Sequence, residues 1–161
     1  MKGPNKTIRR RRIEGKTDYK ARLSLISSGK TRLVIRKTNR YIIAQLVQSD
    51  IAQDKVLVGV SSKDLLEKGW SKDLQGSLKG LPAAYLTGLL LGKNAKGKVK
   101  EAILDMGMYR NVKRSRIYAA LKGAIDSGLK VSCSETILPS MEDLKRNEKT
   151  AKLFDKLVKS I

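Results

Sequence analysis

The chain has 161 residues, 40% of them hydrophobic, and its 35 Lys and Arg against 15 Asp and Glu give a formal net charge of +20. This length suits one domain with extensions, and this hydrophobic content excludes a globally disordered chain. No run approaches the roughly 18 apolar residues of a membrane span, and no apolar stretch follows the N-terminal charges as it would in a signal peptide.

Residues 1–16 are predicted to form a basic RNA-binding arm. Fourteen of the 35 basic residues lie in the first 40 positions, beside only two acids, and four of them, Arg9–Arg12, are consecutive. Adjacent arginines repel one another and need an external polyanion, and the planar guanidinium is well matched to phosphate. Nucleic acid is the expected partner, because membrane binding would need larger apolar anchors than Ile8 and Ile13. The plain alternative is a solvated, disordered tail.

Residues 17–135 are predicted to form an α/β RNA-binding domain, and residues 136–161 a C-terminal helical extension. Hydrophobic patterning predicts strands over 31–37, 41–47, 56–61, 101–106 and 129–131. Capping residues and helical spacing predict helices over 17–29, 83–95 and 115–128, and a last helix that starts at Ser140. The strand over 56–61 is apolar throughout, so we expect it in the centre of the sheet.

The hairpin of the first two strands is predicted to have one apolar and one basic face. Side chains alternate along a strand, so Leu33 and Ile35 share the core face while Arg32, Arg36 and Tyr41 point the other way. This pattern indicates that helices cover the apolar face of the sheet and that phosphates contact its basic face.

The order of elements predicts a mixed sheet. The first three strands follow one another through short connections and should be antiparallel, whereas the later strands alternate with helices and should be parallel. The arrangement resembles a ribonuclease-H-like topology with a basic N-terminal arm and a C-terminal helix.

The residue types in the chain give little support to a catalytic function. There is no histidine, which removes Ser-His-Asp and Cys-His systems and the usual zinc ligand sets. The single cysteine, Cys133, excludes an internal disulfide and fits a packed residue in a reducing compartment. Residues 92–98 match the pattern G-x-x-x-x-G-K, but Val99 replaces the hydroxyl of a P-loop, and the segment follows a helix. We expect no cofactor, no metal and no small-molecule substrate.

One catalytic alternative stays open, a metal-dependent nuclease. Such chemistry needs several carboxylates at strand ends, and Asp105 closes a predicted strand. The first strand carries no acid, and Asp105 lies between basic segments, so pairing with Arg or Lys is the competing interpretation.

Basic residues form three clusters in the arm, the hairpin and the loop before the 115–128 helix. They are Arg9–Arg12 with Lys16; Arg32, Arg36, Lys37 and Arg40; and Arg110, Lys113, Arg114 and Arg116. Tyr41 and Tyr109 lie within the last two and offer rings for base stacking, or else half-buried packing. Lysines over 93–100 form a fourth basic patch. The alternative interpretation of this patch is a solvated surface that binds nothing. No DNA-reading helix motif is visible, which favours a folded RNA recognised by shape, although charge alone also allows a DNA-packaging protein.

The stretch 32–47, Arg-Leu-Val-Ile-Arg-Lys-Thr-Asn-Arg-Tyr-Ile-Ile-Ala-Gln-Leu-Val, resembles the signature hairpin of a ribosomal protein family. This family, number eighteen in the universal numbering, binds 5S ribosomal RNA in the large subunit. Further agreeing motifs occur in order at 17–23, 61–65, 69–70, 81–88, 102–107 and 123–129. The Leu81–Gly88 motif resembles the archaeal–eukaryotic branch, and the length resembles the archaeal members.

The resemblance implies a structural, non-catalytic protein of the cytoplasmic ribosome. Its partners would be 5S rRNA, large-subunit rRNA and neighbouring ribosomal proteins of the central protuberance. The implied and clustered RNA-binding residues are Arg9, Arg10, Arg11, Arg12, Lys16, Tyr19, Arg22, Arg32, Arg36, Lys37, Asn39, Arg40, Tyr41, Tyr109, Arg110, Lys113, Arg114 and Arg116. Two places depart from the family pattern: Tyr41 replaces a common His, and the loop 108–111 differs from the Gly-Gly-Tyr form of bacterial relatives.

Overall fold

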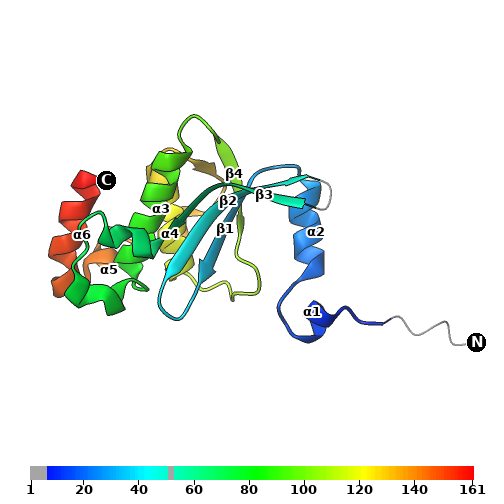
Figure 1. Ribbon diagram of the computed structural model, residues 1–161, viewed down its shortest axis with the longest axis horizontal. Helices are drawn as coiled ribbons and strands as arrows, with labels where there is room; N and C mark the ends of the chain where they lie inside the picture. Colours follow the sequence, from blue (N-terminus) through cyan, green and yellow to red (C-terminus); the bar gives the residue numbers. More distant parts are fainter. Residues whose placement is uncertain (1–6, 51–52) are drawn as a thin grey trace, which may run out of the picture.

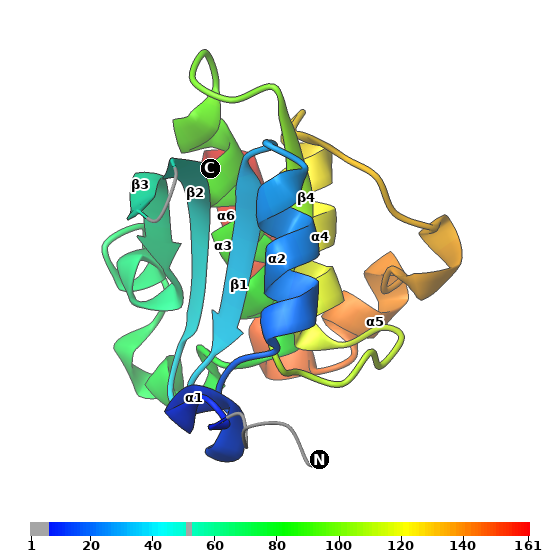
Figure 2. The ribbon, with the colours of Figure 1, turned by 90° about the vertical axis from the view of Figure 1, so that its right-hand side faces the viewer.

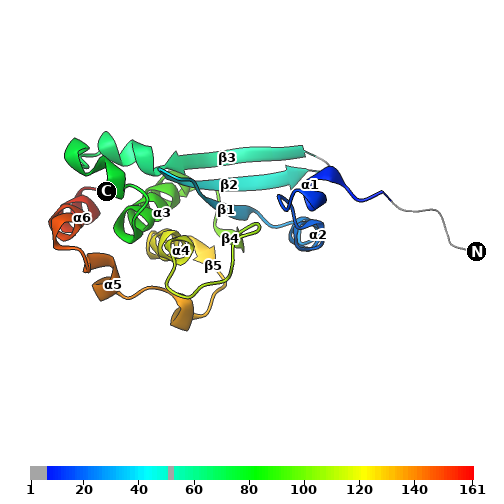
Figure 3. The ribbon, with the colours of Figure 1, turned by 90° about the horizontal axis from the view of Figure 1, so that it is seen from below.

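The computed structural model describes residues 7–50 and 53–161, so positions 1–6 of the predicted arm lie outside the described residues. Figures 1 and 3 show the chain in successive layers along its longest axis. The C-terminal helices α5 (Met141–Lys145) and α6 (Glu148–Ser160) come first, then α3 (Leu81–Ala95) and α4 (Arg116–Asp126). The sheet follows, and α2 (Tyr19–Ser27) lies on its other face, with α1 (Arg10–Ile13) below α2 in Figure 1.

The sheet has five strands in the order β3-β2-β1-β4-β5. Their bounds are β1 Arg32–Lys37, β2 Ile42–Asp50, β3 Gln53–Ser61, β4 Glu101–Asp105 and β5 Lys130–Val131. The first three strands pair antiparallel, while β4 runs parallel to β1 and β5 parallel to β4. The predicted mixed α/β sheet is therefore confirmed.

The expectation that the third strand is central is wrong, because β3 forms the edge and β1 lies in the middle. The apolar run of β3 is only partly covered. Val56 is 51% exposed, and Val60 is its one buried hydrophobic residue. An apolar composition thus did not distinguish a half-covered edge strand from a central one.

Helices α3 and α4 cover the core face of the sheet, and glycines let them approach closely. A Cβ on Gly88 would lie 1.9 Å from the Ala120 carbonyl oxygen, and one on Gly123 would lie 2.0 Å from that of Tyr85. Pro82 occupies the first turn of α3, as predicted. The helix is buried on nearly all sides rather than along one stripe, because the sheet, α4 and α6 surround it.

The C-terminal segment forms two helices where one was predicted. The Ser140–Asp143 capping box opens α5 as expected, but the Asn147 side chain accepts a hydrogen bond from the Lys149 N–H and starts α6 anew. Phe154 of α6 is fully buried, with its ring centroid 5.4 Å from that of Tyr85. Residues 136–161 therefore share the core of the preceding domain.

Helix α2 is the least buried long element. The Asp18 side chain caps it by accepting from the N–H groups of Lys20 and Ala21, which confirms the predicted start, yet none of its residues is buried and Leu23 is 67% exposed. The remaining elements are the 3₁₀ turns η1 (Ser62–Leu66), η2 (Lys72–Ser77) and η3 (Glu135–Ile137). Within the described ranges, no helix has the length and apolar character needed to cross a bilayer.

Candidate nucleic-acid interface

Apart from Arg32, which lies at the other end of β1, the three basic clusters meet along one end of the molecule. Because β1 and β4 are parallel, both strands finish at the same edge of the sheet, which places the hairpin tip beside the loop 106–115. Figures 1 and 2 show these two segments and α1 at the lower end of the molecule. A groove of about 480 Å³ between them is lined by Arg11 and Lys16 of the arm, Arg36 of β1 and Met108 of the loop. We call the basic residues of 9–16, 37–40 and 110–116 the basic edge.

Within residues 7–16, the described part of the arm, most of the charge is unpaired. Glu14 is its single acid and pairs with Lys16 at 2.9 Å and Arg10 at 3.5 Å. The Arg11 Nε donates to the Thr17 hydroxyl at 2.9 Å, and the Arg9 guanidinium lies 4.5 Å from the centre of the Tyr19 ring. All four arginines are exposed. Such an arm can reach an external anion without breaking a buried contact.

Tyr109 joins the loop 106–115 to the hairpin. Its hydroxyl donates to the Lys37 carbonyl oxygen at 2.5 Å and accepts from the Lys37 N–H at 3.2 Å, while the Lys37 ammonium lies 5.3 Å from the ring centre. This ring therefore positions two basic segments. Tyr41 is half-buried against the core, and beside it Asn39 and Arg40 are exposed at the hairpin tip.

The loop 106–115 and Arg116, the first residue of α4, present further cations around a groove of about 560 Å³. Arg110 and Lys113 are exposed, whereas Arg116 is half-buried. Arg114 has a left-handed backbone (φ 55°), its N–H donates to the Ile137 carbonyl, and its side chain lies 3.7 Å from the Asp143 carboxylate. The exposed side chains of Met108 and Val112 also line this basic groove and make part of it apolar.

Arg32 lies in a buried ion-pair network and does not face solvent as the hairpin pattern predicted. Its side chain is 3% exposed and donates to Asp105 at 3.0 Å, Asp54 at 2.7 Å and Ser49 at 2.8 Å. Arg22 of α2 reaches the other Asp54 oxygen at 3.0 Å. Burial of this guanidinium follows from α2 and the start of β3, which cover the face that was expected to be open.

Arg36 occupies the boundary between this network and the groove. Its guanidinium, 37% exposed, donates to the Asp105 carboxylate at 2.8 Å and to the Asp105 carbonyl at 2.7 Å. The sheet register explains the geometry: Asp105 is aligned with Val34, so Arg32 and Arg36 lie one same-face position to either side of it. Gly107, with φ 61°, donates its N–H to Asp105 at 2.9 Å and packs against Arg36.

The ion pairs keep both carboxylates ionised. Burial alone would raise the pKa of Asp105, but hydrogen bonds from Arg36, Gly107 and Arg32 outweigh it, so the pKa is lowered. Burial likewise opposes ionisation of Asp54, and Ser49 and Arg32 with the charges of Arg32 and Arg22 lower its pKa below the usual value.

These contacts also bear on the nuclease interpretation of Asp105. Both of its carboxylate oxygens accept from guanidinium groups, as the competing interpretation predicted. Across residues 7–50 and 53–161, no three His, Cys, Asp or Glu side chains come together in a way that could hold a metal ion. Sequence reasoning missed Asp54, which only the β2–β3 register brings beside Ser49 and Arg32.

Comparison with known proteins shows which family this chain is similar to. The family model for ribosomal large subunit proteins 60S L5 and 50S L18 matches residues 5–102 and 93–134. The large ribosomal subunit protein uL18 of Methanoculleus marisnigri is 50% identical over 137 residues, which cover 84% of this chain and 76% of that protein. The protein of the same name from Korarchaeum cryptofilum is 50% identical over 149 residues, covering 92% and 74%.

Proposed function

The chain belongs to the family of ribosomal large subunit proteins 60S L5 and 50S L18, and from this premise we propose that it is a structural constituent of the large ribosomal subunit that binds 5S ribosomal RNA. Family membership confirms the resemblance carried by the hairpin and the later motifs. The same membership identifies a structural protein of the ribosome and not an enzyme.

The observation that carries the RNA-binding proposal is the convergence of three separate basic segments on one edge. Exposed cations of the arm, the hairpin tip and the 110–116 loop outnumber the acids beside them, Glu14 and Asp143. Cations spread over an arm, a turn and a loop suit the irregular phosphate surface of a folded RNA. A single groove-reading helix would present its cations along one face instead.

The structure suggests how the predicted contact residues divide. Solvent-facing guanidinium and ammonium groups of Arg9–Arg12, Lys37, Arg40, Arg110 and Lys113 are available for phosphate, and Arg36 is accessible from the groove. Arg32 instead holds β1 to β3 and β4, and Arg22 holds α2 to the same network. We therefore assign these two residues a positioning role.

The finer parts of the proposal rest on the family resemblance. They are attachment of 5S rRNA at the central protuberance, further contacts with large-subunit rRNA, and neighbouring ribosomal proteins as partners. The strand order β3-β2-β1-β4-β5, antiparallel and then parallel, is the arrangement expected for a ribonuclease-H-like topology, which we also infer.

A competition assay tests the proposal against a general DNA-packaging role. Purified chain is titrated with 5S rRNA and with duplex DNA at ~0.3 M salt, where non-specific phosphate binding is weak. We expect a clear preference for 5S rRNA, and a log K that falls with log salt at a slope of about −6 to −7 if about eight phosphates are contacted. Equal affinities for the two nucleic acids would contradict the proposal.

A further inference from the structure

The groove beside the loop 106–115 contains apolar surface within the basic edge. Its volume of about 560 Å³ lies within the range of ~300–1,000 Å³ that is typical of small-molecule sites. Two of its lining side chains are large, apolar and open to solvent, since Met108 is 53% exposed and Val112 is 55% exposed. We call this groove, whose lining also includes Tyr109, Leu81 and Ile117, the loop groove. Phosphate binding does not account for its apolar lining, because phosphates are bound by N–H and O–H donors.

The loop that carries the two exposed side chains is held in place along its length. Its Tyr109 hydroxyl is hydrogen-bonded to the hairpin backbone. The Asn111 side chain accepts a hydrogen bond from the buried Tyr118 of α4 at 2.5 Å, and the Arg114 N–H donates to the Ile137 carbonyl at 2.9 Å. A ligand that covers both apolar side chains therefore gains free energy from their burial without first having to order the loop.

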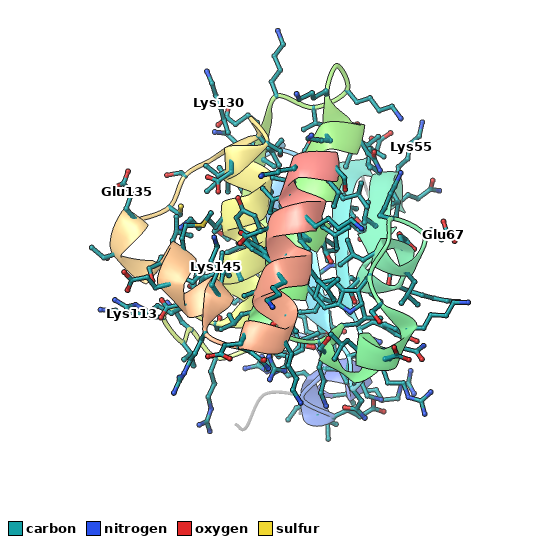
Figure 4. The ribbon with its side chains drawn as sticks, turned by 90° about the vertical axis from the view of Figure 1, so that its left-hand side faces the viewer. Lys55, Glu67, Lys113, Lys130, Glu135 and Lys145 are labelled. Atoms are coloured by element: carbon teal, nitrogen blue, oxygen red, sulfur yellow. The ribbon has the colours of Figure 1, made fainter. Side chains whose placement is uncertain are left out.

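The charged residues that line the loop groove are all cations. They are Lys37, Arg110, Arg114 and Arg116. Of these four, only Arg114 has an acidic partner among the described residues, the Asp143 carboxylate at 3.7 Å. Figure 4 shows that Lys113, from the same loop, lies at the surface at the lower end of the molecule. The ligand that fits this lining has an apolar part and carries negative charge next to it.

An unpaired nucleobase of an RNA has this combination of properties. Its ring faces stack on apolar and aromatic side chains and on guanidinium planes, and a phosphate lies on each side of it along the RNA chain. A fully paired duplex offers no such ring, because its bases are stacked on one another. A protein partner fits less well, since a stable protein interface covers about 800 Å² on each partner, whereas the loop groove offers two exposed apolar side chains.

We propose that the loop groove holds one unstacked nucleobase of the bound RNA against Met108 and Val112, while its cations contact the neighbouring phosphates. The inference rests on the proposed function in that an RNA occupies the basic edge. Phosphate contacts position an RNA but do not distinguish one RNA from another. Met108 and Val112 are therefore specificity-determining residues, which favour an RNA with unpaired bases over a fully paired one.

The double variant Met108→Ser/Val112→Ser tests this assignment with 5S rRNA and with a fully paired RNA duplex, each titrated over a salt series. We expect the affinity for 5S rRNA to fall about 10-fold, as for the loss of one stacked base, and the affinity for the duplex to stay the same. The salt slope should be unchanged for both RNAs, because no phosphate contact is removed. An unchanged affinity for 5S rRNA, or an equal fall for both RNAs, would overturn the proposal.

The matched control is Val56→Ser/Met141→Ser, which removes the same two residue types from exposed positions outside the basic edge. Val56 is 51% exposed and Met141 is 45% exposed. The circular dichroism spectra of both variants should match that of the original chain, and the control should bind both RNAs as the original chain does. A control that loses the same affinity for 5S rRNA would show that exposed apolar surface in general is responsible, and would overturn the assignment to the loop groove.

A second assay does not depend on 5S rRNA being the ligand. It compares two RNA duplexes of the same sequence, one fully paired and one with an additional bulged 2-aminopurine. The original chain should bind the bulged duplex about 10-fold more tightly and change its 2-aminopurine fluorescence, whereas the double variant Met108→Ser/Val112→Ser should bind both duplexes equally.

This preference for the bulged duplex would remain even if the chain showed no preference for 5S rRNA, so failure of the proposed function and failure of the base site give different results. Equal binding of the two duplexes by the original chain would overturn the inference. More effective competition by a Leu- and Glu-rich peptide than by unlabelled bulged duplex would assign the loop groove to a protein segment, and would also overturn it.

Discussion

Arg32 and Lys37 stand at the two ends of the six-residue strand β1, yet their environments are opposite. The Arg32 side chain is 3% exposed and contacts two carboxylates, whereas Lys37 is exposed and its ammonium lies over the Tyr109 ring. Two basic residues of one hairpin thus serve different purposes. A basic residue that is paired with carboxylates of the chain, as Arg32 is, stabilises the fold. A basic residue without such a partner, as Lys37 is, remains available to bind an external polyanion.

Framework and binding edge are nevertheless coupled through Arg36. This residue shares Asp105 with Arg32 and also lines the groove beside the arm. The buried network therefore fixes the end of β4, from which the loop 106–115 departs toward the hairpin. The following variants separate the two roles.

The largest expected effect is on stability, from Arg32→Met. The change leaves Asp54 and the buried Asp105 with fewer donors, and removing one partner of a buried ion pair should lower the free energy of unfolding by about 3 kcal/mol. Urea unfolding followed by circular dichroism measures it. The control Lys37→Met removes the same charge from an exposed site on the same strand and should change stability by less than ~0.5 kcal/mol. Equal stabilities of the two variants would show that the network is not structural.

The next effect is on RNA affinity, from the arm variant Arg10→Gln/Arg11→Gln/Arg12→Gln. If each arginine neutralises one phosphate, the salt slope should fall by about 2 to 3 and the affinity at ~0.15 M salt by about 100-fold. Unfolding should be unaffected, because none of the arm residues that the structure describes, 7–16, is buried. Filter binding over a salt series gives the slope, and Lys149→Gln/Lys152→Gln/Lys156→Gln serves as the charge-matched control. An unchanged slope would mean that the arm contacts no phosphate.

A smaller loss of stability is expected from Gly107→Ala. The left-handed backbone disfavours any side chain there, and the new Cβ would lie 3.1 Å from the Arg36 guanidinium carbon. The variant should lose about 1–2 kcal/mol of stability. Gly97→Ala has a similar backbone but no atom within 4 Å of the new Cβ, so it isolates the backbone contribution. If Gly107→Ala is no worse than Gly97→Ala in thermal unfolding, the packing against Arg36 does not contribute.

The smallest expected effect within the usual pH range is acid destabilisation through Asp54 and Asp105. Their pKa values in the folded chain lie below the ordinary aspartate value of 3.8, so the unfolded chain binds more protons than the folded one. The stabilisation is fully present above that ordinary value and is lost as pH falls through the lowered folded pKa values. Urea unfolding between about pH 7 and about pH 3 should show this loss, with a shallower dependence in Asp54→Asn. A flat profile would contradict the network's role.

Local signals in the sequence were sufficient for most elements of the fold. The Asp18 cap and the Ser140 capping box each fix a helix start through hydrogen bonds within a few residues. Pro82 favours the first turn of α3 because its ring fixes φ near the helical value. The position of β3 at the edge of the sheet depends on the order in which the strands pair. The apolar residues around Val56 do not determine that order. The break between α5 and α6 depended on Asn147, whose capping role competes with a continuous helical pattern.

For the site, the sequence indicated which residues are basic but not which of them are already neutralised. Lys37, Arg40 and Arg110 were expected to be available and are exposed. Arg32 was expected beside them, but its partners Asp54 and Asp105 lie 22 and 73 residues away in the chain. Only the sheet order and register bring those carboxylates to it, and neither follows from spacing in the sequence.

The most direct test of the account is a crosslinking map of the chain bound to 5S rRNA, read residue by residue by mass spectrometry. The account predicts crosslinks in the arm, at the hairpin tip and in the 110–116 loop, and none at Arg32. Crosslinks confined to α6, with the arm and the hairpin tip open to solvent in the complex, would contradict it.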